Sequence, residues 1–234
     1  MMNPIASLAP AIKDLATTQK SSFATTQAVW RFLNNENVSF HQLNQPIEKL
    51  VFDQVAQLKH KYILVAHDWS QLQYVKHDNK INRIKRTHAN DLSYELQSSL
   101  LVDVEQGLPI APIAQTLSDS TGRYSTFDDQ FADPETHLNA LMQQNDHIEA
   151  MPIEQKIVHI IDREGDSVAR YREFEQKGYQ WLIRGKESNT VEYLGQTLKL
   201  KDVTDQVATH EIKCIEYKGQ KVMLHVGEAD IRIT

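Results

Sequence analysis

Two aspartates stand directly after apolar, β-branched runs of the chain. Asp68 follows 61–67, which reads KYILVAH, and Asp162 follows 156–161, which reads KIVHII. Short runs of this kind predict strands that are covered on both faces. Carboxylates at the ends of neighbouring strands, about 4.8 Å apart, could reach one divalent ion or a pair of ions. Oxygen ligands favour Mg²⁺ or Mn²⁺, and such ions stabilise the attacking and leaving oxygens in phosphoryl transfer.

Each aspartate also has a simpler explanation, because a carboxylate after a strand often caps the next helix. The pair His67-Asp68, together with His60, further matches the pattern of HD phosphohydrolases. The ligands of those enzymes lie on helices, however, whereas 62–66 has the pattern of a strand. The sequence contains no His-Glu-x-x-His, no Gly-x-Ser-x-Gly and no phosphate-binding glycine loop. The sequence therefore leaves two interpretations of each aspartate, a metal ligand and a helix cap.

A basic segment lies between the two aspartates in the sequence. Residues 76–88 carry five Lys or Arg and one acid, although the whole chain has a net charge of −6. The basic residues are Lys76, Lys80, Arg83, Lys85 and Arg86. Positive charge concentrated on an acidic protein is typical of a surface that contacts nucleic-acid phosphates, and a solvated loop is the alternative.

The elements that must position these residues begin with helices. Residues 1–60 read as helical, and we expect Asn37 or Ser39 to cap a helix that reaches about His60. Proline removes a backbone donor and clashes with the preceding turn, so Pro46 predicts a kink or a break in that helix.

The middle of the chain alternates strands with helices. Strands are expected at 61–67, 93–104, 108–117, 156–161 and 179–184, and helices at 134–149 and 166–177. Pro109 and Pro112 indicate an edge or a bulge in the third of these strands. From Thr190 the sequence is β-rich, with a hairpin around 218–220. This order predicts an α/β protein, a mixed sheet covered by helices, in three parts: 1–60, 61–189 and 190–234.

Composition excludes several classes of protein. The 234 residues are 41% hydrophobic and 24% charged, which are ordinary globular values, so a wholly disordered chain is excluded. No apolar run approaches the roughly twenty residues of a membrane span, and the first twenty residues do not read as a secretory signal. Cys214 is the single cysteine, which excludes an internal disulfide and a multi-cysteine zinc site. We expect a cytoplasmic protein.

Three motifs resemble those of one enzyme family. The stretch 162–166, DREGD, resembles the Asp-Arg-Glu signature of bacterial DDE transposases of the insertion-sequence-four group, to which the transposon-five transposase is similar. The segment 27–39, QAVWRFLNNENVS, is similar to the helical N-terminal region of that group. The segment 67–70, HDWS, is similar to its first-aspartate motif, with Trp69 in place of the usual Thr. The resemblance covers nearly the whole chain, in order.

The resemblance implies a ribonuclease-H-like core in which Asp68 and Asp162 bind Mg²⁺ or Mn²⁺, with Arg163 and Glu164 in supporting roles. The implied activity is metal-dependent cleavage of DNA at transposon ends, followed by strand transfer into target DNA. The implied partner is double-stranded DNA at the bacterial nucleoid, and a homodimer is compatible with this activity. Residues 190–234 would begin the β-rich insertion that interrupts the core in this group.

One feature of the family has no counterpart in the sequence. The third carboxylate of the family follows the insertion, on a helix with the pattern Tyr-x2-Arg-x3-Glu-x6-Lys. The segment 171–177 has similar letters, but Phe174 stands where the pattern requires Arg, and no other tyrosine has the spacing. We therefore expect a truncated transposase that lacks the third acid. The alternatives are a catalytically inactive DNA-binding or inhibitory protein, and a structural domain that is independent of nucleic acid.

Overall fold

The computed structural model describes residues 22–74, 77, 79–85, 91–128, 132 and 137–233. The N-terminal helices are α1 (Ser22–Leu33) and α2 (Phe40–Val55). The central part comprises β1 (Tyr62–Gln73), β2 (Ile84–Lys85), β3 (Leu92–Val102), β4 (Pro109–Ser118), β5 (Arg123–Ser125), α3 (His137–Glu149), β6 (Lys156–Ile161), the 3-10 helix η3 (Arg163–Gly165), α4 (Val168–Lys177) and β7 (Gln180–Ile183). The C-terminal part comprises β8 (Thr190–Tyr193), β9 (Gln196–Lys199), α5 (Leu200–Thr204), β10 (His210–Tyr217), β11 (Gln220–Val226) and β12 (Arg232–Ile233).

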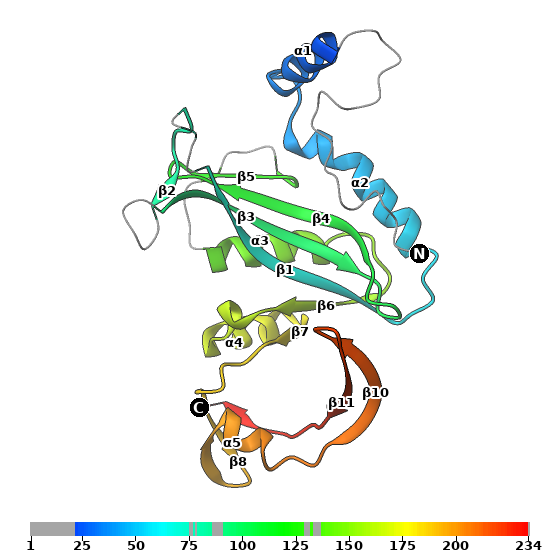
Figure 1. Ribbon diagram of the computed structural model, residues 1–234, viewed down its shortest axis with the longest axis vertical. Coiled ribbons are helices and arrows are strands. Elements are labelled where there is room, and N and C mark those ends of the chain that lie inside the picture. The colour runs from blue at the N-terminus through cyan, green and yellow to red at the C-terminus, as the bar shows by residue number, and fades with distance from the viewer. Residues whose placement is uncertain are drawn as a thin grey trace.

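Seven of the described strands form one mixed sheet in the order β5-β4-β3-β1-β6-β7, with β2 added beside β3 (Figure 1). Strands β1, β3 and β4 form an antiparallel meander. Strand β6 then returns beside β1 in the parallel direction, and β7 lies parallel to β6. Helix α3 precedes β6 and helix α4 precedes β7, so each parallel strand is reached through a helix. The predicted α/β class with a mixed sheet is confirmed.

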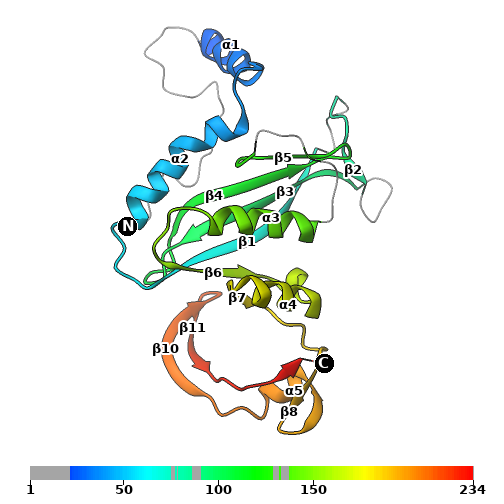
Figure 2. The ribbon, with the colours of Figure 1, turned by 180° about the vertical axis from the view of Figure 1, so that it is seen from behind.

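One face of this sheet carries the hydrophobic core. Because side chains alternate between faces along a strand, Ile63, Val65 and Ile157 point to the same side, and they pack with Val51 of α2 and Ile148 of α3. A second cluster continues the same face under α4, through Leu141, Met142, Ile161 and Phe174. Helix α3 lies behind the strands in Figure 1 and in front of them in Figure 2. Helices α2, α3 and α4 thus cover one face.

The opposite face of the sheet is bare of helices within the described residues. Its inner strands present Leu64, Ala66, Val158 and Ile160, all partly exposed, and the edge strand β7 adds Leu182, which is 61% exposed. A hollow of about 460 Å³ opens on this face beside Leu64 and Val158. We call this the bare face and the other the covered face.

Helix α2 excludes the break that was one of the two outcomes predicted at Pro46. Ser39 caps it as expected, in a capping box with Gln42. The helix is not broken at Pro46, however, and continues to Val55. Pro46 and Gln42 are both exposed, so water can reach the carbonyl that lost its intrahelical donor.

Strand β1 also differs from its prediction, since it continues to Gln73 instead of ending at Asp68. The additional residues pair with β3 in an unbroken ladder up to Gln73↔Ser93. Strand β4 follows the prediction for a strand that contains two prolines. Its register with β3 shifts beside Pro109 and Pro112, which confirms the bulge.

The elements further along the chain are close to their predictions. Helix α4 ends at Gly178, which has the left-handed φ of 72° that favours glycine. Ser167 caps its start, one residue after the aspartate that was expected to begin it. The hairpin β10–β11 turns at Lys218 and Gly219, both with positive φ. No helix of the described residues is both long and apolar enough to cross a membrane.

Candidate active site

The structure places Asp68 and Asp162 on neighbouring parallel strands. The register pairs His67 of β1 with Ile161 of β6, and the next residue on each chain is one of the two aspartates. Asp162 keeps an extended backbone, with φ −75° and ψ −167°, so side-chain alternation continues through it. Alternation then puts both carboxylates on the bare face, opposite the buried side chains of His67 and Ile161. Asp68 lies within β1, not at its end.

Both carboxylates are exposed and only partly engaged by the protein. The Asp162 Oδ1 atom accepts a hydrogen bond of 2.8 Å from the backbone N–H of Glu164, so this residue does cap the 3-10 helix η3. The hydroxyl of Ser70 lies 3.4 Å from Asp68 Oδ2. These contacts leave further oxygen lone pairs of both residues facing solvent. Capping and cation binding are therefore compatible at Asp162.

No third acid joins the pair within the residues that the structure describes. Within the described part of the chain, no group of three or more His, Cys, Asp or Glu side chains is arranged to hold a metal ion. Asp166 is the nearest buried carboxylate in sequence, but its oxygens accept hydrogen bonds from Tyr171 Oη, Lys186 N and Asn189 Nδ2. Burial and the bond to Asp166 raise the pKa of Tyr171 well above its usual value. Asp166 therefore ties α4 to the loop after β7.

Residues 171–177 of α4, whose sequence resembles the missing family helix, contact other side chains of the protein. Glu173 pairs with Arg170 at 2.6 Å, and Lys177 pairs with Asp146 at 2.6 Å. Tyr171 stacks on Trp181 with ring centroids 5.0 Å apart. These side chains hold α4 in place on the covered face.

Arg163 and Glu164 lie beside Asp162, within η3. Both are exposed, and the Arg163 guanidinium is 3.8 Å from Glu187, which is a weak surface pair. Arg163 therefore has a solvated charge in the turn that follows Asp162.

The basic segment forms the connection from β1 to β3 (Figure 1). Lys80 is exposed and its ammonium lies 5.0 Å from the Tyr74 ring, while Arg83 donates to the Tyr74 carbonyl at 3.3 Å. Lys85 is exposed on β2. Lys76 and Arg86 lie outside the described residues. At about 3.3 Å per residue, the end of β1, after which the segment begins, is roughly 17 Å from Asp68.

Sequence reasoning considered His67 only as part of the HD pattern and missed His159, and the two side chains meet on the covered face of the sheet. His67 and His159 are both buried, and their rings meet through a 2.8 Å hydrogen bond between Nε2 and Nδ1. Burial, with a smaller effect of His159, holds the pKa of His67 well below its usual value. The available signal was that each histidine stands at an inward position of an otherwise apolar strand.

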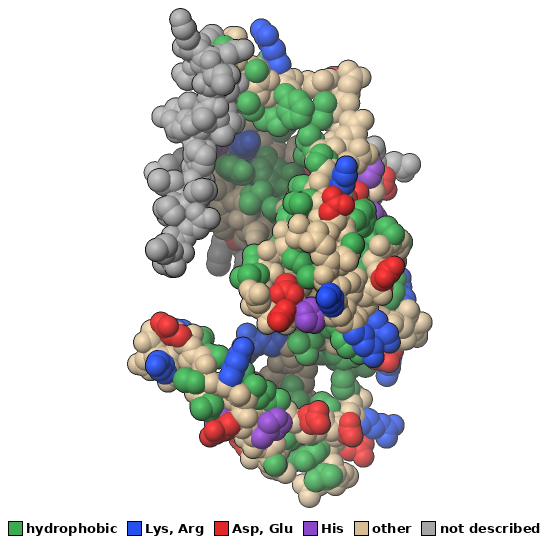
Figure 3. Space-filling model, turned by 90° about the vertical axis from the view of Figure 1, so that its right-hand side faces the viewer, with side chains coloured by type: hydrophobic (Ala, Val, Ile, Leu, Met, Phe, Trp, Pro, Cys, Tyr) green, Lys and Arg blue, Asp and Glu red, His purple; other side chains and the backbone are tan. Residues whose placement is uncertain are grey.

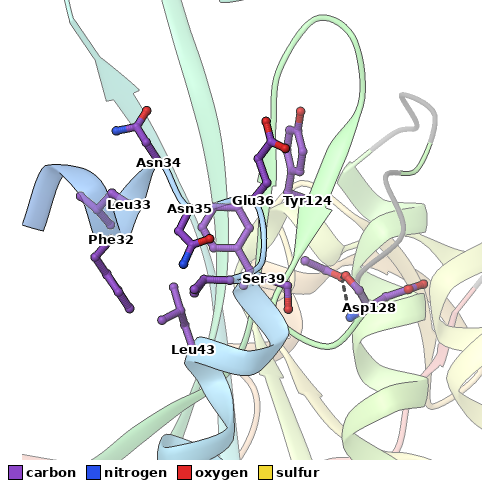
Figure 4. A pocket seen from close by; sticks show the side chains of 12 residues that line it. Phe32, Leu33, Asn34, Asn35, Glu36, Ser39, Leu43, Tyr124 and Asp128 are labelled. Atoms are coloured by element: carbon purple, nitrogen blue, oxygen red, sulfur yellow. Dashed lines mark hydrogen bonds between the residues drawn. The ribbon is translucent and has the colours of Figure 1, made fainter.

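A separate hollow lies at the N-terminal end of the molecule. It measures about 510 Å³ between α1, the start of α2 and β5, and its lining includes Phe32, Leu43 and Tyr124 (Figure 4). Apolar side chains gather on the surface at this end, over α1 (Figure 3). The described lining holds the acids Glu36 and Asp128, and it includes residues 32–36, 38 and 39 of the segment 27–39 that the sequence singled out.

Comparison with known proteins finds no sequence match and only weak structural similarity. No family model and no curated protein sequence matches the chain. Among solved structures, the chain resembles a Mos1 transposase paired-end complex with left transposon end, with 11% identity over 69% of this chain and 50% of that one. It also resembles a pre-cleavage Mos1 transpososome, with 10% identity over 69% of this chain and 51% of that one. The TM-score is 0.24 in both cases, which is too low to transfer fold or function. The chain spans about half the length of these proteins.

Proposed function

We propose that this chain carries the carboxylate pair of a DDE-type DNA transposase, which cleaves DNA at transposon ends and joins it to target DNA. The observation that supports the proposal is that Asp68 and Asp162 directly follow His67 and Ile161, which are paired in the parallel ladder of β1 and β6. The DREGD stretch at 162–166, which resembles the signature of the insertion-sequence-four group, agrees with it.

The topology supports the ribonuclease-H-like core that the resemblance implies. An antiparallel meander is followed by two parallel strands, each reached through a helix, and both aspartates lie on the central pair β1 and β6. The proposed catalytic residues therefore directly follow His67 and Ile161, the last pair of the parallel β1–β6 ladder.

The donor set fits a hard divalent cation. Asp68 and Asp162 would hold Mg²⁺ or Mn²⁺ through carboxylate oxygens, with the remaining positions open to water and phosphate. When bound, the ion polarises the scissile phosphate and activates the attacking oxygen. The protein itself holds the two carboxylates opposite each other. Arg163 supplies positive charge near the phosphate, and Glu164 fixes Asp162 through its backbone N–H.

Double-stranded DNA is the proposed partner, bound through phosphates along the basic segment. Lys80, Arg83 and Lys85 of the described chain, with Lys76 and Arg86, would position the duplex without reading its sequence. A homodimer would let two such chains hold two transposon ends.

A second candidate function follows from the absence of a third acid near the pair within the described residues. Two carboxylates can hold one ion, but a second ion would be poorly held, and positioning is most of the catalysis of phosphoryl transfer. The chain would then be a catalytically inactive DNA-binding protein, or an inhibitor of intact transposase subunits.

Binding of Mn²⁺ tests the proposed site. We expect the wild-type protein to bind Mn²⁺ in calorimetry and to show paramagnetic broadening of NMR signals around β1 and β6. Asp68→Asn and Asp162→Asn should each abolish both effects. Asp53→Asn, which removes an exposed carboxylate from α2, is the matched control and should leave binding unchanged. Equal Mn²⁺ binding by all four proteins would refute the proposal.

Salt dependence tests the DNA surface. Neutralising Lys80, Arg83 and Lys85 to Ala should weaken binding to any duplex and reduce the slope of log affinity against log salt by about one per lost phosphate contact. Replacing Lys199, Lys201 and Lys218, which are exposed in the C-terminal part, is the charge-matched control. An unchanged slope in the first variant would remove the basic segment from the DNA interface.

A further inference from the structure

A chain of buried hydrogen bonds crosses the covered face and passes through His67, the residue before Asp68. It runs from Thr116 through Gln144, Ser99, His67 and His159 to Glu149. The residues belong to four strands and α3, and all but Glu149 are buried. The distances in this order are 2.8, 2.5, 2.8, 2.8 and 3.1 Å. We call this set the polar relay.

The carboxylate at one end determines the direction of every bond. Glu149 can only accept, so His159 must donate from Nε2, and its Nδ1 must then be an acceptor. His67 in turn donates from Nε2 to His159 Nδ1 and keeps Nδ1 as an acceptor. The Ser99 hydroxyl donates to that nitrogen and accepts from Gln144 Nε2. Each bond then has one donor and one acceptor, with both rings neutral in the Nε2–H form.

The relay links the two strands that carry the aspartates. The His67–His159 bond joins β1 to β6 by side chains, in addition to the parallel ladder. His67 immediately precedes Asp68, and the pleat sends the two side chains to opposite faces of one backbone. A ring that is fixed on the covered face therefore restricts the backbone from which Asp68 projects on the bare face. His159 also makes an edge contact with the Phe174 ring and a tilted contact with the Tyr179 ring.

We infer that Glu149, acting through His159 and His67, is a positioning residue that holds Asp68 opposite Asp162 for cation binding. This inference rests on the proposed function, because it gives the relay a role only if the aspartates bind a metal. Glu149 stands at the last residue of α3, where the helix dipole disfavours an acid. Its bond to a buried imidazole supplies the compensating interaction.

The test combines a tautomer measurement with Mn²⁺ binding. In wild-type protein, ¹⁵N NMR of the imidazole nitrogens should report the Nε2–H form for both histidines. Glu149→Ala removes the terminal acceptor, so the tautomer of His159 should change, and Mn²⁺ affinity should fall about tenfold, as for other residues that orient metal ligands. Glu149→Gln keeps a carbonyl acceptor and should preserve both readouts. Ile113→Val, in the core away from the relay, controls for loss of stability alone and should change neither.

The outcomes separate the two claims. If Asp68→Asn abolishes Mn²⁺ binding but Glu149→Ala does not weaken it, the positioning role is wrong and the metal site stands. If Asp68→Asn binds Mn²⁺ as wild type does, the proposed site is wrong and the positioning role falls with it. Should Glu149→Ala fail to fold, Ser99→Ala carries the same test from the other end of the relay, since it removes the hydroxyl that donates to His67.

Discussion

The two faces of the central sheet differ at the same point of β1 and β6. On the covered face, His67 and His159 are buried beneath α3 and α4 and every polar atom of their rings has a partner. On the bare face, one residue after His67 and three residues after His159, Asp68 and Asp162 are exposed and have unused lone pairs. Burial and satisfied hydrogen bonds make the first face a source of stability. Exposure and unsatisfied charge make the second a place for a ligand.

The largest expected difference between the faces is in packing. Phe174 is fully buried on the covered face, against His159 and Tyr179, and Phe174→Ala should lower the free energy of unfolding by about 3–5 kcal/mol. Leu182 is mostly exposed on the bare face, and Leu182→Ala should change it by less than about 0.5 kcal/mol. Urea denaturation measures both. Similar losses would show that the bare face is packed in solution.

Acid should weaken the covered face first. The folded pKa of His67 is well below its usual value because of burial and the nearby His159, so the unfolded chain binds the proton more readily. The contribution is complete above the unfolded pKa of about 6.5 and is lost as pH falls below it, at up to about 1.4 kcal/mol per pH unit. Unfolding measured from pH 7.5 to 5 should show this slope.

A variant without the imidazole tests whether His67 causes this dependence of the unfolding free energy on pH. His67→Asn removes the titrating ring, so its unfolding free energy, although lower overall, should depend less on pH across the same range. A slope that is unchanged in His67→Asn would mean that another group, such as the partly buried His147, whose pKa is also lowered by burial, is responsible.

The sequence predicted correctly those elements whose limits depend on a few neighbouring residues. The limits of β6 match the apolar run 156–161, and Gly178 ends α4, because a buried strand and a left-handed cap each leave a signature in a few residues. The extension of β1 to Gln73 could not be predicted in this way. Its last residues are polar, and they are extended because they pair with β3, some twenty residues away.

The candidate site shows the same division. The residue type and position of each aspartate indicated a carboxylate after a strand, but only the parallel register of β1 and β6 places them next to each other. The polar relay was not predicted, because it joins four strands and a helix through side chains that are unremarkable one at a time. The sequence could not decide between a kink and a break at Pro46, since the rule for proline does not include the exposure of the freed carbonyl.

The smallest expected effect, and the sharpest test of the comparison, is that of Asp68→Asn on stability without metal. An exposed carboxylate with one long contact contributes little to the fold, and its repulsion of Asp162 across one strand spacing is at most about 1 kcal/mol in a solvated setting. In EDTA and low salt, Asp68→Asn should therefore raise the free energy of unfolding slightly, and 1 M salt should remove the gain by screening. With Mn²⁺ present the order should reverse, because only the wild-type protein gains binding energy in the folded state. A substantial loss of stability in EDTA would mean that Asp68 holds the sheet together, and that the bare face resembles the covered face in carrying structure.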